Sequence, residues 1–209
     1  EKKGEGLELY SQPLAPTIGT QAQLPILLCE YVFYTRQDVE DYLNILEYLD
    51  TFYGQILSFE QEKANAGLMM SDTSLDHVID SCKSYLLVPG NTFKERLAAL
   101  PDLTDDEKKE LYSRNEKALE EHFVPAYKLL IDGLEALKGT GTNDKGMCGY
   151  PNGKAYYEYL VYTATGTSYH SIDELMTATE QEISNNLQTT SKLLSEHPEL
   201  ESMLSDYHY

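Results

Sequence analysis

The glycine-rich loop over 139–153 carries the residue spacing closest to a ligand-binding motif. Gly141 and Gly146 have the spacing G-x-x-x-x-G of a phosphate-binding loop. A working loop continues with Lys and then Ser or Thr, because the ammonium and the hydroxyl meet the phosphates and their metal. Met147 and Cys148 stand there instead, and no apolar strand precedes the loop. The sequence therefore predicts a flexible connector here rather than a nucleotide site.

Metal-binding patterns are incomplete as well. Asn143 and Asp144 lack the alternating acidic ligands and the closing Glu of a calcium loop. His77 and Asp80 could share a helix face, but a metal site needs three or four converging ligands. His122 is expected at the edge of the core, with its ring bonded to a backbone carbonyl. The chain contains no H-E-x-x-H, G-x-S-x-G or C-x-x-C, so we predict no catalytic residue, metal ligand or cofactor in it.

Tyrosines gather beside the glycine-rich loop. A tyrosine combines a flat apolar face with a hydroxyl at its tip, which suits the wall of a peptide or sugar groove. The alternative is that most of these rings pack in the core and at its boundary. The cluster consists of Tyr150, Tyr156, Tyr157, Tyr159, Tyr162 and Tyr169.

Composition narrows the classes of partner. The 209 residues include 35 acidic and 16 basic side chains, for a net charge of -19. This field repels nucleic acid, because binding phosphates requires clustered Lys and Arg. No apolar run approaches the roughly 20 residues of a membrane span, so no transmembrane segment is expected. Cys29, Cys82 and Cys148 are odd in number and far apart, which does not indicate a disulfide framework.

Amphipathic periodicity predicts the elements that hold these residues. Residues 1–23 are polar and broken by proline, which is typical of an irregular arm. Residues 24–34 are apolar and predict a buried helix with Pro25 at its first position, with a strand as the alternative. Thr35 is expected to cap one long helix that runs to about Ala66. Glu60 falls off the apolar stripe of that helix and is expected to face solvent.

Further helices are expected between residues 71 and 138. Ser71 to Leu87 has a single apolar face, and Val88 to Gly90 should stop it. Asn91 could cap a short helix over 93–100. Thr104 with Glu107 forms a capping box that opens a helix reaching Gly139, and Pro125 should kink or split that helix.

The last part of the chain also reads as helices. Residues 154–164 are apolar on all sides, which favours a helix buried between neighbours. Ser171 and Glu174 form a second capping box, before a long helix that His197 and Pro198 interrupt. A short helix is expected over 198–206. The fold class is all-α, an irregular multi-helix array of about seven to eight helices.

Several stretches occur together in the order found in one known family. They are G-Y-P-N-G-K-A-Y-Y-E-Y-L from Gly149, T-A-T-G-T from Thr163 and S-I-D-E-L from Ser171. Upstream, Asp38 to Leu46 and Val124 to Leu130 are similar to the early helices of that family. With these stretches the chain resembles the bacterial domain-of-unknown-function family 885, whose members look like zinc metallopeptidases.

The resemblance spans Leu24 to Leu194 and implies a helical fold akin to zincin-type peptidases, with a deep central cleft. The family's His-Glu … Gly-His-His zinc segment lies further along the chain, and nothing here matches it. We therefore expect the amino-terminal region of a longer protein, with zinc implied for the full-length family only. The expected segments are an arm over 1–23, helices over 24–138, the loop over 139–153 and helices over 154–209, forming one domain.

What the resemblance implies for function is a wall of the substrate cleft. The remaining carboxy-terminal part of the longer protein is the expected partner, with peptides as ligands. An extracytoplasmic or membrane-anchored lipoprotein is also implied. The alternative is a stand-alone helical module that binds a peptide or protein without catalysis. The expected substrate-binding residues are Tyr150, Tyr156, Tyr157, Thr163, Thr165 and Thr167.

Overall fold

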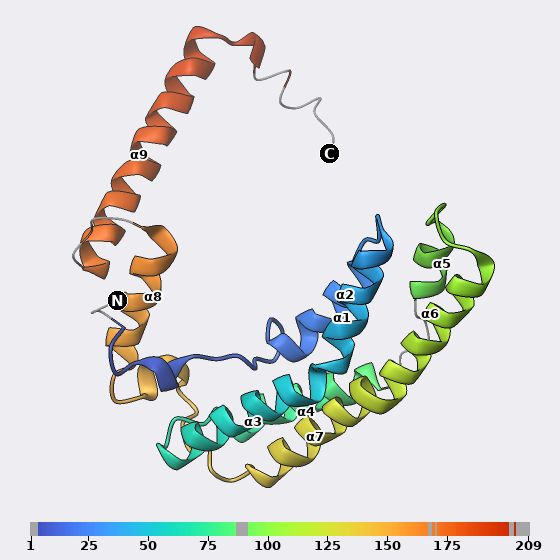
Figure 1. Cartoon of the computed structure of the whole chain (residues 1–209). Coiled ribbons are helices and arrows are strands. Elements are labelled where there is room, and N and C mark those ends of the chain that lie inside the picture. Colours follow the sequence, from blue (N-terminus) through green and yellow to red (C-terminus); the bar gives the residue numbers. More distant parts are fainter. Residues whose placement is uncertain (1–3, 87–91, 167–168, 170, 201–202, 204–209) are drawn as a thin grey trace. The chain divides into compact units, whose positions relative to one another are not determined.

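The computed structural model describes residues 4–86, 92–166, 169, 171–200 and 203. Two compact units divide the chain, residues 1–153 and residues 154–209, and each is considered by itself (Figure 1). Every regular element among the described residues is a helix, which confirms the all-α prediction. None of the helices in these described ranges has the length and apolar run needed to cross a membrane.

The first long helix of the prediction is two helices in the structure. Helix α2, Arg36–Glu47, begins at the predicted cap, where the Thr35 hydroxyl and the Asp38 carboxylate bond each other's backbone N–H groups. Tyr48 then separates it from helix α3, Leu49–Asn65. The prediction of one continuous helix was wrong. The sequence gives no sign of the break, because the apolar stripe continues across Tyr48 and no Gly or Pro stands there.

The start of helix α1 also differs from the prediction. The helix spans Thr20–Glu30, with Gly19 at its amino-terminal cap, so Pro25 lies inside it rather than at its first position. A proline inside a helix removes one N–H donor and crowds the carbonyl four residues earlier. The structure therefore has to supply another donor for that carbonyl.

Two tyrosine hydroxyls from other helices supply donors at this place. The carbonyl that Pro25 cannot reach is that of Gln21, and the Tyr127 hydroxyl donates to it at 2.8 Å. The Tyr85 hydroxyl donates to the neighbouring carbonyl of Ala22 at 3.0 Å. Buried backbone acceptors of this kind are costly when unpaired. These bonds satisfy the gap left by Pro25 and fix α1 to the helices beneath it.

The next three helices begin close to the predicted positions. Helix α4, Asp72–Tyr85, starts after Ser71, whose hydroxyl accepts from the Ser74 N–H. Helix α5, Phe93–Ala98, is short, and the predicted stop at Val88 to Gly90 and cap at Asn91 lie outside the described residues. Helix α6, Asp105–Ala118, opens with the predicted capping box of Thr104 and Glu107.

Pro125 is accommodated by a widened helical turn. A π-helical turn, Leu119–Phe123, joins α6 to helix α7, Val124–Ala136, and the Val124 N–H donates to the Leu119 carbonyl five residues earlier. Such wide turns occur where a normal helical bond is lost, and Pro125 has no N–H to give. The predicted kink or split is thus a π-turn that keeps α6 and α7 in one rod (Figure 1).

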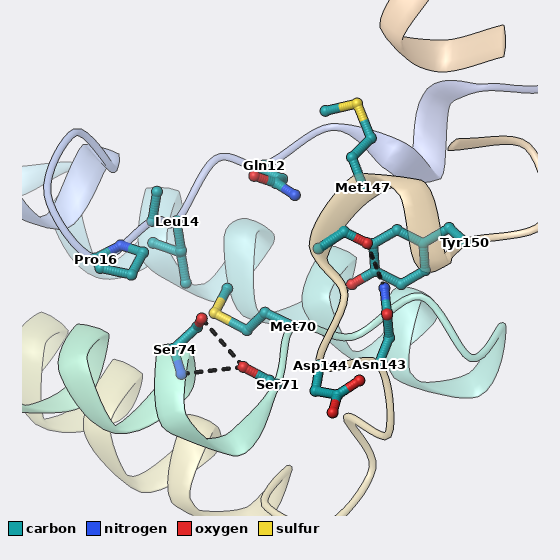
Figure 2. A pocket seen from close by; sticks show the side chains of 12 residues that line it. Gln12, Leu14, Pro16, Met70, Ser71, Ser74, Asn143, Asp144, Met147 and Tyr150 are labelled. Carbon is teal, nitrogen blue, oxygen red and sulfur yellow. Dashed lines mark hydrogen bonds between the residues drawn. The ribbon is translucent and has the colours of Figure 1, made fainter. Parts of the chain in front are cut away.

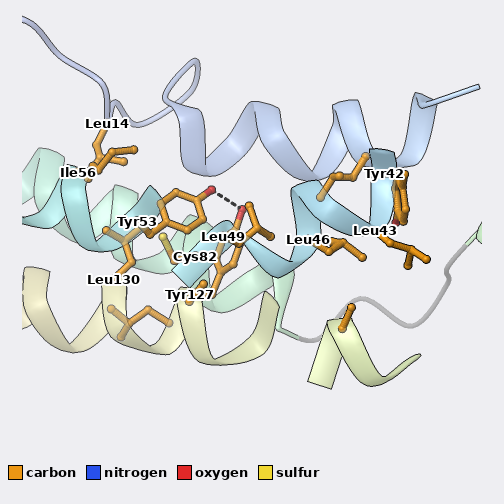
Figure 3. Packing of buried hydrophobic residues seen from close by; sticks show 14 of the residues in the cluster. Leu14, Tyr42, Leu43, Leu46, Leu49, Tyr53, Ile56, Cys82, Tyr127 and Leu130 are labelled. Carbon is orange, nitrogen blue, oxygen red and sulfur yellow. Dashed lines mark hydrogen bonds between the residues drawn. The ribbon is translucent and has the colours of Figure 1, made fainter. Parts of the chain in front are cut away.

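The core of the first unit lies between α3, α4 and α7 (Figure 3). Tyr53 and Tyr127 face each other in its centre, with their hydroxyls 3.0 Å apart and their rings nearly perpendicular. Cys82 lies beside them, and burial raises the pKa of its thiol to about 12. Full burial of one large apolar side chain stabilises a fold by about 1.5–3 kcal/mol, so this centre is a main source of stability.

A buried ion pair lies on α3. Glu60 is fully buried, and the side chain of Lys63 is 3 % exposed. The Lys63 Nζ lies 3.1 Å from Oε2 of Glu60 and 3.3 Å from Oε1, where it donates a hydrogen bond. Burial raises the pKa of the Glu60 carboxyl, and Lys63 partly offsets this. The expectation that Glu60 faces solvent was wrong, because its partner one turn away offsets part of the cost of burying its charge.

The second unit contains two described helices. Helix α8, Gly153–Thr165, agrees with the predicted range. Helix α9, Ile172–Glu196, begins after Ser171 as its cap predicts. Tyr156 is buried, but Tyr157 is 51 % exposed, so α8 is not enclosed on all sides as expected. The predicted helix over 198–206 falls largely outside the described residues.

Candidate functional site

The glycine-rich loop is anchored at both ends. At its start, the Gly139 N–H donates to the Asp72 carboxylate, at 2.9 Å to Oδ1 and 3.2 Å to Oδ2. At its end, the Asn152 N–H donates to the Tyr10 hydroxyl at 3.2 Å. These bonds tie the loop to the start of α4 and to the amino-terminal arm. The prediction that the loop is a flexible connector is not tested by these bonds and stays a prediction.

Asn143 organises the middle of the loop. Its amide Nδ2 donates to the Gly146 carbonyl at 2.6 Å, and its Oδ1 accepts from the Lys145 N–H at 3.0 Å. Gly146 has a φ of 63°, a left-handed conformation that favours glycine. A 3-10 turn, Gly146–Gly149, follows. Gly146, which is part of the spacing that resembles a phosphate-binding loop, thus allows a tight turn that Asn143 stabilises with hydrogen bonds.

Tyr150 closes the loop against the segment before α4 and against the arm. Its hydroxyl donates to the Met69 carbonyl at 2.9 Å. Its ring meets the Tyr10 ring edge-on, with 6.2 Å between centroids. Burial raises the pKa of Tyr150, so the phenol stays protonated and remains a donor at neutral pH.

A cavity of about 420 Å³ opens between the arm, the start of α4 and this loop (Figure 2). Its polar groups come from all three segments, and the Ser71 hydroxyl donates to that of Ser74 at 3.2 Å. The apolar part of the wall comes from Leu14, Pro16, Met70 and Met147, and the polar part from Gln12, Ser71, Ser74, Asn143, Asp144 and Tyr150. This mixture fits a short extended segment that offers both backbone amides and apolar side chains.

The structure distributes the predicted site residues unevenly. Only Tyr150 lines the cavity, while Tyr156 and Tyr157 lie on α8 in the second unit. The hydroxyls of Thr163 and Thr165 donate to carbonyls of their own helix, at 2.9 Å and 2.7 Å. Thr167 lies outside the described residues. The assignment of these five residues to a substrate site stays a prediction.

Sequence reasoning missed the other walls of the cavity. Ser71 was noted only as the first residue of an amphipathic stretch, and the arm residues Gln12 and Leu14 carried no motif. These segments are separated by more than 50 residues along the chain, and only the tertiary fold brings them together. The anchoring of the loop by Asp72 could have been suspected from its place in the first turn of a capped helix.

A second, smaller cavity lies beside the π-turn. It measures about 260 Å³ and is lined by charges of both signs, including Glu47, Arg114 and Glu121. His122 is half-buried there, as expected, but its Nδ1 lies 3.6 Å from the Asp50 carboxylate instead of bonding a backbone carbonyl. Lys117 lies 3.7 Å from Glu121, and Arg114 lies 2.8 Å from Glu40 on α2. These are surface ion pairs, and their charged groups do not converge on one point where a ligand could bind.

Zinc, which the resemblance implies for longer proteins, finds no ligand set in this structure. Among the described residues, no three His, Cys, Asp or Glu side chains lie close enough together to hold a metal ion. His77 and Asp80 on α4 thus remain an isolated pair. A metal site needs converging ligands, so the residues present do not fit the ion.

Two comparisons place the chain among known proteins. Residues 3–207 match the model of a family described as "Bacterial protein of unknown function (DUF885)". Among curated proteins, none matches this chain significantly.

A solved structure shares the fold. It is described as "The crystal structure of the putative lipoprotein from Colwellia psychrerythraea", and it is 17% identical to this chain with a TM-score of 0.69. The match covers 89% of this chain and 33% of that chain. At this identity the likeness concerns the fold alone. The chain therefore spans about a third of the length of that structure.

Proposed function

The chain belongs to the family of bacterial proteins of unknown function DUF885, and we propose that it is the amino-terminal helical region of a longer, zinc-peptidase-like protein. In this proposal the region contributes a wall of the substrate cleft and performs no chemistry itself. The part it plays is to bind a peptide segment and orient it. An extracytoplasmic location goes with the proposal, since the similar solved structure is described as a "putative lipoprotein".

The cavity beside Tyr150 is the observation that supports this proposal. Its walls offer hydroxyl, amide and carboxylate groups next to apolar side chains, as a peptide requires. The loop that carries most of these groups is held by bonds at both ends, so little ordering is needed when a ligand binds. Asp144 and the net charge of -19 favour a peptide with a basic side chain.

Direct binding tests the proposal on this chain alone. We expect a pool of acetylated, amidated hexapeptides with one fixed Lys to shift the backbone NMR signals of Ser71, Asn143 and Tyr150. A pool with Glu at the fixed position should bind more weakly. Met147→Ala and Asp144→Asn should each weaken binding about tenfold, which corresponds to about 1.4 kcal/mol.

Tyr157→Ala is the matched control, since this exposed ring lies on α8 and outside the cavity. It should leave hexapeptide binding unchanged. Shifts that are confined to α8, or a loss of binding in Tyr157→Ala alone, would move the site away from Tyr150. Absence of any shift at millimolar peptide would contradict a peptide wall in this region.

The close contact of the glycine-rich loop with Met70 leads to a separate prediction about the stability of the protein. A Cβ at Gly141 would lie 1.8 Å from the Met70 carbonyl oxygen, and a backbone atom cannot rotate away. Gly141→Ala should therefore lower the free energy of unfolding by about 1–3 kcal/mol, as overpacking does. Urea unfolding measures the loss, and hydrogen exchange should quicken over residues 139–153.

Gly54→Ala provides the comparison for the same chemical change. Gly54 lies inside α3, and a Cβ there would meet its nearest neighbour at 3.9 Å, an ordinary contact. This variant should be stabilised by up to about 1 kcal/mol, because alanine favours a helix over glycine. If Gly141→Ala is as stable as Gly54→Ala, the loop does not press on Met70.

A further inference from the structure

Within the second unit, helix α9 carries a long apolar stripe that is largely exposed. None of the residues of α9 is buried, and Ile183 and Leu187 are 55% and 64% exposed. The stripe lies on one side of the helix at helical spacing and consists of Ile172, Leu175, Met176, Ile183, Leu187 and Leu194. Helices in proteins draw most of their stability from packing such a face. The stripe thus has the form of a docking surface.

Acidic side chains border this stripe on both edges. At about 100° per residue, Asp173 and Glu180 fall along one edge, and Glu182 falls along the other. Lys192 is the only basic residue in the sequence of α9, and it lies on the far side, 3.8 Å from Glu196. The apolar stripe is therefore framed by negative charge.

This frame selects among the surfaces that could cover the stripe. A second copy of α9 would bring acidic edges against acidic edges, and like charges at such flanking positions disfavour pairing. An anionic membrane surface attracts helices with Lys and Arg on the polar face, and α9 has the opposite charge. The matching partner is an apolar surface bordered by Lys or Arg.

We propose that α9 docks on an apolar, basic-edged surface in the part of the longer family proteins that this chain does not span. The similar solved structure supports this choice of occupant, since this chain covers only 33% of it. The inference rests on the proposed function in one respect, namely that such longer proteins contain this region as one part. It assigns to α9 the task of joining that region to the rest.

Designed peptides test the chemistry of this surface with the chain as it is. The first probe is a 25-residue helical peptide with a leucine stripe bordered by lysine, and the second has glutamate in place of every lysine. The lysine-edged peptide should bind, measured by fluorescence anisotropy, and should slow hydrogen exchange within Ile172–Glu196. The glutamate-edged peptide should bind at least about tenfold more weakly, because several edge charges reverse sign.

Charge-matched variants separate the stripe from general attraction between the acidic chain and a basic peptide. Ile183→Asp with Leu187→Asp interrupts the stripe and should abolish binding. Asn185→Asp with Gln188→Asp adds the same two charges on the far side of α9 and should leave the affinity within about twofold. Circular dichroism of both variants checks that the helix content is equal.

Three results would overturn the proposal. These are equal affinity for both peptides, protection from exchange outside α9, and a dimer in sedimentation that Ile183→Asp with Leu187→Asp dissociates. The last result would make a second copy the occupant. The α9 variants should leave the hexapeptide shifts at Asn143 and Tyr150 unchanged, so failure of this inference is distinguishable from failure of the peptide site.

Discussion

Lys63→Met is expected to lower the free energy of unfolding by about 3–5 kcal/mol at neutral pH, since it removes one partner of a buried ion pair. Glu60 is fully buried, and Lys63 is the cation beside it, at 3.1 Å. Without that cation the carboxylate must either stay charged in an apolar surrounding or take up a proton. Urea unfolding measured at pH 7 gives the loss directly.

The pH dependence of this loss has a definite sign. Burial raises the pKa of Glu60 in the folded protein above its ordinary value of 4.5, and removal of Lys63 raises it further. A raised carboxyl pKa means that the folded state holds the proton more tightly than the unfolded state does. Stability from this group is thus present below pH 4.5 and lost as the pH rises through the folded pKa. The cost of Lys63→Met should shrink toward acid pH.

The double variant Glu60→Leu with Lys63→Met is the control. Replacing both partners of a buried pair by apolar residues of similar volume is often neutral, or stabilising by about 1–4 kcal/mol. It should therefore recover the stability that Lys63→Met loses at pH 7. A single variant with the same loss at pH 5 and pH 8 would show that lost packing, and not buried charge, is responsible.

Tyr127→Ala should lower the free energy of unfolding by about 3–5 kcal/mol, the range for removing a large buried aromatic side chain. Tyr127 is fully buried, and its ring packs against those of Tyr53, Tyr85 and Phe123. The variant empties the middle of the core and also leaves the Gln21 carbonyl without its donor. Thermal unfolding followed by circular dichroism measures the shift.

Tyr127→Phe separates the hydroxyl from the ring. It keeps the packing and should cost about 1–3 kcal/mol, since a buried carbonyl loses its hydrogen bond. Pro25→Ala restores an N–H that can donate to the Gln21 carbonyl within α1. Tyr127→Phe should therefore cost less in a Pro25→Ala background. Strict additivity of the two changes would argue against this account of how α1 tolerates its proline.

Local signals predicted where most helices begin. Thr35 with Asp38 and Thr104 with Glu107 form the expected capping boxes, because both partners lie within three residues of each other. The features that were predicted wrongly depend on contacts between residues far apart in the sequence. Pro25 is tolerated inside α1 only because a hydroxyl from α7 replaces the missing donor. That hydroxyl is 106 residues away, so no local pattern announces it.

The candidate site was predictable only in part for the same reason. Tyr150 drew attention because it stands beside glycines and other tyrosines, and it does line the cavity. Ser71 and Gln12 reach the cavity only through the tertiary fold. The burial of Glu60 was hidden as well, because its partner Lys63 is a residue type that normally lies in solvent.

The π-turn before Pro125 also determines on which side of α6 and α7 the buried side chains lie. Leu111 and Leu130 are 19 positions apart, and so are Asn115 and Leu134, and all four are fully buried. In a regular α-helix such a separation leaves two side chains about 100° out of phase. A π-turn takes up one extra residue, and the remaining 18 or so make five whole turns. The π-turn thus takes up the one residue by which the separation of 19 exceeds five whole turns, and α6 and α7 present a single face to the core.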